Sequence, residues 1–188
     1  MYDISDGWFK QAHKIDSPNC NDRPENIAVD AIIIHSISLP PGCYEGNDIS
    51  QFFSNQLDCN KDPYYDEIRA MEVSAHLLIR RSGELLQFVN LHARAWHAGQ
   101  SQLGEQTNCN DFSIGIELEG TDNSAFESAQ YNTLTGVVAS LMNYFPQITQ
   151  QRIVGHSDIA PGRKTDPGSG FNWPHWQKML NDEKSGKI

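Results

Sequence analysis

An unbroken run of apolar residues, Ala31-Ile32-Ile33-Ile34, lies inside a strand that the sequence predicts over residues 27–35. A strand with one face in solvent alternates apolar and polar residues, whereas a continuous β-branched run is typical of a strand covered on both faces. Such a strand requires helices packed on a sheet. The run therefore predicts a fold that combines a sheet with covering helices.

Periodicity and turn residues predict the other elements. They are a short helix over 49–55, strands over 73–80, 85–89, 112–119 and 152–155, a long helix between 124 and 145, and a short terminal helix opened by Pro174. The turn Arg81-Ser82-Gly83-Glu84 favours an antiparallel hairpin. Ser124 and Glu127 have the spacing of a capping box at the start of the long helix. Strands interrupted by helices predict the α/β (α+β) class, with one central mixed β-sheet flanked by helices.

The chain has 188 residues and contains no repeat, low-complexity tract or long linker, so residues 1–188 should form a single domain. Its core should run from about residue 7 to 180, followed by a polar, frayed tail over 181–188. No segment has the order of a signal peptide, and no apolar run approaches about 18 residues, which favours a cytoplasmic protein that does not span a membrane. Its four scattered cysteines, without a CxxC motif, favour reduced thiols over disulfides.

The chain is acidic, because 24 Asp and Glu against 14 Lys and Arg give a formal net charge of -10. A chain of this charge lacks the basic surface that nucleic-acid binding needs and should not attach to anionic lipid. We therefore expect no nucleic acid and no membrane as partners, and nothing in the sequence indicates an obligate protein partner.

Two histidines directly follow predicted strands: His35 ends the apolar strand, and His156 comes after residues 152–155. A single histidine in such a place is more often a structural residue. If the two strands are neighbours, both imidazoles would converge with Asp166, which lies on a loop rich in Pro and Gly. Two imidazoles and one carboxylate can bind zinc and leave one position for water. The wide spacing along the chain leaves the structural alternative open.

Glu117 lies on the small, acidic face of the strand over 112–119. The other face of that strand is apolar and carries Phe112, Ile114, Ile116 and Leu118. A carboxylate on a covered sheet face needs a cation or hydrogen-bond donors beside it, whereas a carboxylate in solvent needs neither. The sequence leaves both interpretations open.

Two other side chains are candidates for the same pocket. Lys164 precedes Asp166 by two residues, so the loop can turn both toward one point or expose them in a surface turn. Trp96 stands in the segment RAWHAG at 94–99, where its ring could hold the apolar face of a sugar or fill the core.

Together these segments closely resemble the AmpD proteins. The likeness covers nearly the whole chain, from Gly7 to Trp173. It is carried by IHSISLPPG at 34–42, VSAH at 73–76, RAWHAG at 94–99, CNDFSIGIELEG at 109–120 and GHSDIAPGRKTDPG at 155–168. AmpD proteins are cytosolic zinc amidases that cleave 1,6-anhydro-N-acetylmuramoyl-L-alanine during cell-wall recycling in bacteria, and they share a fold with peptidoglycan recognition proteins.

The resemblance implies that one Zn²⁺ is the cofactor and that an anhydro-muropeptide is the substrate. It implies that His35, His156 and Asp166 hold the zinc, that Glu117 is the acid/base residue and that Lys164 supports the charged intermediate. Arg163, together with the aromatic platform Trp96, should contact the substrate. Some members carry Arg where this chain has Glu72 and Asn108, so the resemblance does not define which stem peptide is preferred.

Three alternatives stand beside this interpretation. A non-catalytic peptidoglycan-binding module could use the same fold, although a complete set of ligands with Glu117 and Lys164 argues against it. The sequence His156-Ser157-Asp158 also has the H-x-D spacing of Fe(II) oxygenases, but the following histidine, His175, is only 19 residues further on, and the predicted long helices do not suit an all-β fold. A serine or cysteine hydrolase is the weakest alternative, because the chain has no GxSxG motif.

Overall fold

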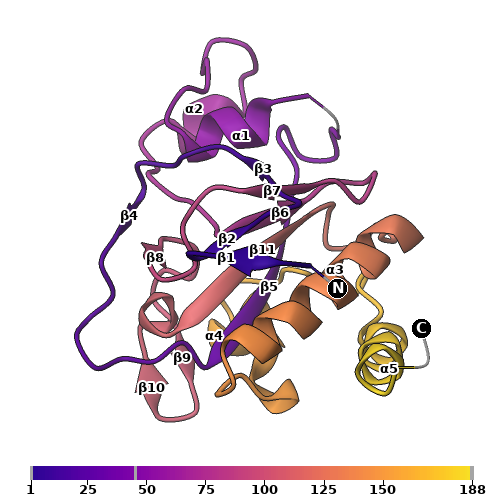
Figure 1. Ribbon diagram of the computed structural model, residues 1–188. Helices are drawn as coiled ribbons and strands as arrows, with labels where there is room; N and C mark the ends of the chain where they lie inside the picture. Colours follow the sequence, from indigo (N-terminus) through magenta and orange to yellow (C-terminus); the bar gives the residue numbers. More distant parts are fainter. Residues whose placement is uncertain (1, 45, 187–188) are drawn as a thin grey trace.

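The computed structural model describes residues 2–44 and 46–186, and a six-stranded sheet forms the centre of this described part (Figure 1). The strands lie in the order β12 (Ile153–Gly155), β5 (Ala31–Ile37), β11 (Ser113–Glu119), β6 (Leu77–Ile79), β7 (Leu85–Gln87) and β3 (His13–Lys14). The first four are parallel, and β7 is antiparallel to β6. The mixed sheet confirms the predicted fold class, and the β6–β7 pair confirms the predicted hairpin.

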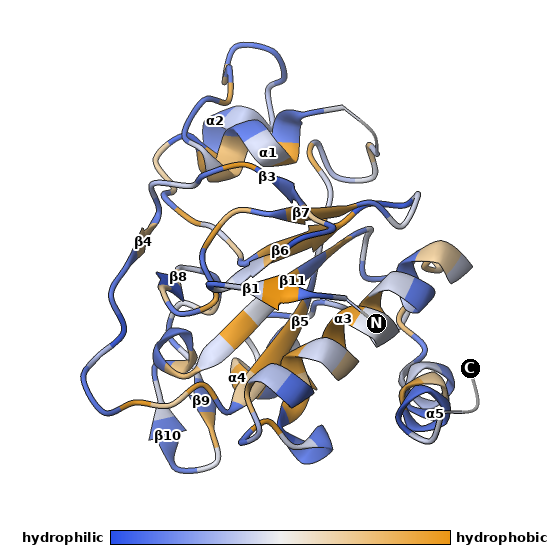
Figure 2. Cartoon of the chain, in the orientation of Figure 1, coloured by the Kyte–Doolittle hydropathy of each residue, from blue (hydrophilic) through white to orange (hydrophobic). Residues whose placement is uncertain are grey.

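Two long helices cover one face of the sheet. Helix α3 (Ser128–Tyr144) lies along the strands, and α5 (Trp173–Lys184) packs against α3 (Figure 1). Figure 2 shows hydrophobic colour along β5 and, alternating with paler segments, along β11. Their inward side chains join those of the two helices in one buried cluster, which includes Ile34, Ile116, Leu134, Val138 and Trp176. This cluster is the larger part of the core and anchors the sheet from behind.

The opposite face is covered by short elements: α1 (Asp48–Phe53), α2 (Tyr65–Ile68), α4 (His156–Ile159) and loops. Two apolar clusters pack there. One contains Phe53, Leu78 and Phe88, and the other contains Ile33 and Ile159. Leu78 pairs in register with Glu117, and Glu117 with His35, so all three side chains share this face.

Strand β11 alternates as the sequence predicts, with Ile114, Ile116 and Leu118 in the large cluster. Phe112 does not belong to that face. It directly follows the 3₁₀ helix η1 (Cys109–Asp111) and packs with Ile33 on the other side of the sheet. All seven residues of β11 are buried, so its acidic face is not exposed to solvent.

Several short elements were not predicted. They are the two-residue pairs β1 (Ile4–Ser5) with β2 (Trp8–Phe9), β4 (Cys20–Asn21) with β8 (Arg94–Ala95) and β9 (Gln102–Leu103) with β10 (Gln106–Thr107), and the 3₁₀ helix η2 (Gln150–Arg152). A two-residue strand has no alternation to detect. No described helix is long and apolar enough to span a membrane, and Cys20, Cys43, Cys59 and Cys109 are free thiols.

The start of α3 and the end of α5 differ from the prediction. The N-cap of α3 is Glu127, whose backbone N–H donates to Gln130 Oε1 at 3.0 Å, so the predicted capping box at Ser124 is wrong. The Ser124 hydroxyl instead bonds to Thr121 Oγ1 at 2.8 Å. Helix α5 continues to Lys184, four residues into the segment predicted to fray, and residues 187–188 lie outside the described part.

Candidate metal centre

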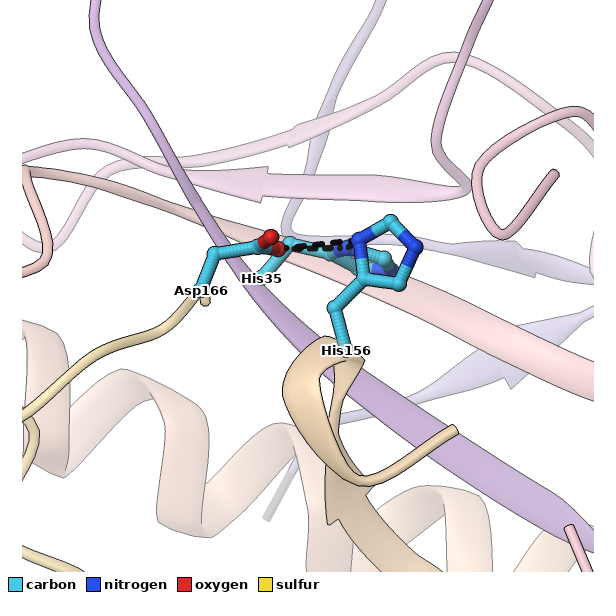
Figure 3. A group of neighbouring side chains, drawn as sticks. All are labelled: His35, His156 and Asp166. Atoms are coloured by element: carbon cyan, nitrogen blue, oxygen red, sulfur yellow. Dashed lines mark hydrogen bonds and ion pairs between the residues drawn. The ribbon is translucent and has the colours of Figure 1, made fainter. Parts of the chain in front are cut away.

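Three side chains from distant parts of the chain meet toward the carboxyl end of β5 (Figure 3). His35 lies on β5, His156 begins α4 directly after β12, and Asp166 lies on the loop that follows. His35 Nδ1 lies 3.0 Å from both His156 Nδ1 and Asp166 Oδ2, and the last two atoms are 3.1 Å apart. Because β5 and β12 are parallel neighbours, they bring both histidines to one edge of the sheet.

The outer nitrogens of the two rings point away from this cluster. His156 Nε2 lies 3.1 Å from the carbonyl oxygen of Ala98, which can only accept, so this nitrogen carries the proton and Nδ1 keeps its lone pair. His35 Nε2 faces His97 Nδ1 at 2.9 Å. The Nδ1 atoms of the two rings and one carboxylate oxygen thus converge, an arrangement that a cation would satisfy. This donor set fits zinc with one open position.

Burial controls the protonation of the cluster. Burial lowers the pKa of His35 to about 4, so at neutral pH its imidazole is neutral, as a metal ligand must be. Burial by itself would raise the pKa of Asp166, but its close interactions with the rings of His156 and His35 outweigh burial and hold this pKa below its usual range. Neutral imidazole and ionised carboxylate are the forms that bind a divalent cation.

Glu117 lies beside the cluster on β11, in register with His35. Its side chain is buried, and its Oε2 has no hydrogen-bond partner among the described residues. Burial, and then the charge of Asp166, raise the pKa of Glu117 well above its ordinary value, while Lys164 opposes the shift. The solvent-facing interpretation of Glu117 is therefore wrong. A buried carboxylate with a raised pKa takes up a proton more readily than an ordinary carboxylate does, as a proton-transferring group requires.

The cluster opens into a cavity of about 640 Å³. Lys164 is exposed and lines the cavity with Glu117, so the loop does turn Lys164 and Asp166 toward one space, as the sequence suggested. The opposite wall is largely apolar and comes mostly from the segment that contains α1 and α2. Its residues include Leu39, Phe52, Phe53, Tyr64, Ile68, Met71 and Val73. One end of the cavity can thus polarise a bond while the other contacts apolar surface.

Two predicted substrate contacts lie elsewhere. Neither Trp96 nor Arg163 is among the described residues that line this cavity. The indole Nε1 of Trp96 donates to Asn21 Oδ1 at 2.7 Å. Arg163 Nη2 donates to the carbonyl oxygens of Ala98 at 2.7 Å and Gln100 at 2.5 Å. Both side chains make contacts between loops, and substrate contact by either remains a prediction.

Two histidines at the centre were not predicted to contact it. His97 lines the cavity and contacts His35, whereas the sequence indicated only that it stands beside Trp96 in a possible sugar platform. His76 is fully buried, its Nδ1 accepts from the Gly115 N–H at 3.0 Å, and its Nε2 donates to Ala93 at 3.1 Å. Burial, followed by the nearby charge of Arg23, lowers the pKa of His76 to about 3. No spacing in the sequence distinguished these two from ordinary core histidines.

The H-x-D alternative does not match the geometry. Asp158 Oδ2 accepts from the backbone N–H of Gly155 at 2.7 Å, and His175 packs its ring on Tyr131 with centroids 5.3 Å apart. Within the described part of the chain, the group able to hold a metal consists of His35, His156 and Asp166. The carboxylate of the centre is therefore not the one that the H-x-D spacing indicated.

Comparison with known proteins places this centre in a family. Residues 25–169 match the family described as N-acetylmuramoyl-L-alanine amidase. The 1,6-anhydro-N-acetylmuramyl-L-alanine amidase AmpD of Escherichia coli K12 is 44% identical over 180 residues, which cover 96% of this chain and 98% of that protein. Its counterpart from Haemophilus influenzae is 45% identical over 174 residues, or 93% and 95% of the two chains.

Solved structures agree with the sequence comparison. The crystal structure of a selenomethionine AmpD derivative is 44% identical, covers 94% of this chain and 98% of its own, and superimposes with a TM-score of 0.92. AmiD from E. coli, solved with the substrate anhydro-N-acetylmuramic acid-L-Ala-D-γ-Glu-L-Lys, is 25% identical with a TM-score of 0.59, over 95% of this chain and 65% of that one. The chain therefore belongs to the N-acetylmuramoyl-L-alanine amidase family of hydrolases, and within it to the AmpD amidases.

Proposed function

We propose that this chain is a zinc-dependent amidase of peptidoglycan recycling. It hydrolyses the amide between the lactyl group of 1,6-anhydro-N-acetylmuramic acid and L-alanine of the stem peptide. The observation that carries this proposal is the convergence of three metal-binding atoms next to the unpartnered carboxyl group of Glu117 in one cavity. The similarity to AmpD, and the muropeptide bound by the related AmiD, support the choice of substrate.

His35, His156 and Asp166 hold the metal in this proposal. When bound, zinc lowers the pKa of a water molecule to about 7 and polarises the scissile carbonyl group. The contribution of the protein is to keep the His35 imidazole neutral, to turn both rings toward the metal and to keep the carboxylate ionised. Burial of His35 and the Ala98 carbonyl opposite His156 support these roles.

Glu117 transfers the proton. One carboxylate oxygen takes a proton from the attacking water, and the same group later gives it to the nitrogen of the leaving L-alanine. The raised pKa of Glu117 suits both steps, because its carboxylate takes up a proton more readily than an ordinary carboxylate and the resulting carboxyl group can then donate it. Its unpartnered Oε2 leaves an oxygen available for the substrate.

Lys164 stabilises the oxygen of the scissile carbonyl as negative charge develops on it. Its side chain lines the cavity from the loop that also carries Asp166. We place the reaction in the cytoplasm, and we assign it to one amidase domain that needs no protein partner. The free cysteines and the likeness to AmpD support this setting.

The proposal is tested by mass spectrometry of two muropeptides, one with a 1,6-anhydro sugar and one with a reducing sugar. The zinc-loaded protein should release free peptide from the anhydro substrate, and a chelator should stop the release. Release from neither substrate by protein that binds zinc would point to the binding-module alternative and overturn the proposal.

A pair of lysine variants tests the polar end of the cavity. Lys164→Met should lower kcat by about a hundredfold, as loss of one group that stabilises the developing charge does elsewhere. Lys178→Met is the matched control, because Lys178 is an exposed lysine on α5 outside the cavity lining. Equal rates for the two variants would remove Lys164 from the mechanism.

A further inference from the structure

His97 lies behind the metal centre and connects it to a buried serine. His97 Nδ1 is 2.9 Å from His35 Nε2, and His97 Nε2 is 3.3 Å from the hydroxyl oxygen of Ser113. That hydroxyl lies 2.5 Å from the carbonyl oxygen of Cys109. A continuous line of polar contacts therefore runs from a backbone carbonyl, through Ser113 and His97, to a ligand of the centre.

Only one arrangement of protons satisfies this line. The Cys109 carbonyl can only accept, so the single hydroxyl proton of Ser113 is donated to it. The Ser113 oxygen then accepts from His97 Nε2–H, which leaves His97 Nδ1 as an acceptor. His35 must donate its Nε2–H to that nitrogen, and the lone pair of His35 is left on Nδ1, facing His156 and Asp166.

The packing holds His97 in this orientation. A Cβ atom added at Gly115 would come within 2.4 Å of His97 Cγ, so the ring lies directly on the backbone of β11. The backbone N–H of His97 donates to Asn110 Oδ1 at 3.0 Å, and the ring of His76 lies edge-on at 5.8 Å. The backbone of β11 and the ring of His76 therefore pack against the His97 ring, and the bond to Asn110 fixes the backbone from which that ring projects.

We propose that Ser113 and His97 are positioning residues that select the tautomer of His35 with a free Nδ1 and thereby strengthen metal binding. The inference rests on the proposed metal centre. The two histidine ligands are controlled differently: the Ala98 carbonyl sets the tautomer of His156, whereas two side chains set that of His35. Outer partners of metal-binding histidines typically contribute about 10- to 100-fold to metal affinity.

Two variants of His97 separate the hydrogen bond from the packing. In His97→Asn, the side-chain oxygen can take the place of Nδ1 and accept from His35. His97→Leu has a similar branched shape but no acceptor. Zinc affinity, measured by competition with a chromophoric chelator, should fall about 10- to 100-fold in His97→Leu and stay within a few-fold of wild type in His97→Asn. Equal affinities for wild type and His97→Leu would overturn the proposal.

A second measurement needs no metal. Long-range ¹H–¹⁵N spectra of the metal-free protein should show His35 protonated on Nε2 in wild type and as a mixture of tautomers in Ser113→Ala. Ser140→Ala is the control, since it removes another buried hydroxyl, on α3. The proposal would be overturned if His35 carried its proton on Nδ1 in wild type. It would also be overturned if the tautomer of His35 in both His97→Leu and Ser113→Ala were the same as in wild type. Because these spectra do not depend on catalysis or zinc, failure of the relay is distinguishable from failure of the proposed function.

Discussion

The two faces of β11 contribute to different parts of the molecule: one packs in the core, and the other faces the metal centre and its cavity. Ile114, Ile116 and Leu118 point into the large apolar cluster beneath α3 and α5. Ser113 and Glu117 point to the other side, where one bonds to His97 and the other lines the cavity. Both faces are equally buried, so burial alone does not distinguish stability from chemistry.

Because side chains alternate between the two faces of a strand, one strand can carry residues that stabilise the core on one face and residues that form the cavity on the other. Residues on the core face contribute free energy of folding through burial of apolar area. Residues on the cavity face cost free energy, because a carboxyl group such as that of Glu117 loses its hydration without gaining a partner for Oε2. Substitutions on the two faces should therefore have opposite consequences for activity and stability.

The largest effect is expected from Glu117→Gln, which keeps the shape of the side chain and removes its ability to transfer a proton. The kcat of zinc-loaded protein should fall by about a hundredfold or more, because general acid–base catalysis contributes at least that much. The urea midpoint should not fall, since the variant removes a poorly solvated carboxyl group. A rate within a few-fold of wild type, with zinc bound, would remove Glu117 from the mechanism.

A substitution on the core face should lower stability and leave the metal centre unchanged. Ile116 is fully buried in the large core, and Ile116→Ala should lower the free energy of unfolding by about 2–5 kcal/mol in urea titrations. Ile116→Val is the matched control and should cost about 0.5–1.5 kcal/mol. Zinc affinity per folded molecule should stay near that of wild type in both. A tenfold loss of zinc affinity would show that the two faces are not independent.

The smallest effect is a change in how stability depends on pH. The folded-state pKa of Glu117 is raised, so folded protein holds this proton more tightly than unfolded protein. The stability it contributes is complete below the unfolded pKa of about 4.3 and is lost as pH rises through the folded pKa. Between pH 5 and pH 8, the unfolding free energy of metal-free wild type should therefore fall relative to that of Glu117→Gln.

The comparison with the variant is needed because His35 acts in the opposite direction. Its pKa is lowered to about 4, so the unfolded chain binds the proton more tightly and stability rises as pH increases through the unfolded pKa of about 6.5. This contribution is common to both proteins and cancels in their difference. A difference that does not change between pH 5 and pH 8 would contradict the raised pKa of Glu117.

The positions of site residues could be predicted from the sequence where those residues lie on or directly after a strand with a clear apolar pattern. The apolar run before His35 and the short strand before His156 predicted two strand ends, and their parallel pairing explains why both histidines reach Asp166. The alternation of β11 likewise placed Glu117 opposite the core. These predictions succeeded because the periodicity of a strand fixes the direction of each side chain.

The contacts of loop residues could not be predicted in the same way. His97 and His35 are 62 positions apart, and their contact depends on the path of a loop stabilised by two-residue strands. Trp96 was predicted as a sugar platform from its chemistry alone, and neither its bond to Asn21 nor its place outside the cavity lining could be read from the sequence. The start of α3 was misplaced because Ser124 bonds within its own turn instead of capping the helix.

The three ligands are also far apart in the order in which the chain is synthesised. His35 is synthesised before His156, and Asp166 follows His35 by 131 positions. A growing chain that ends before residue 156 offers only one of the three ligands, and one that ends before residue 166 offers two. The complete centre therefore requires both β12 beside β5 at the sheet edge and the loop that carries Asp166, so no partial chain that stops before residue 166 can bring all three ligand atoms together.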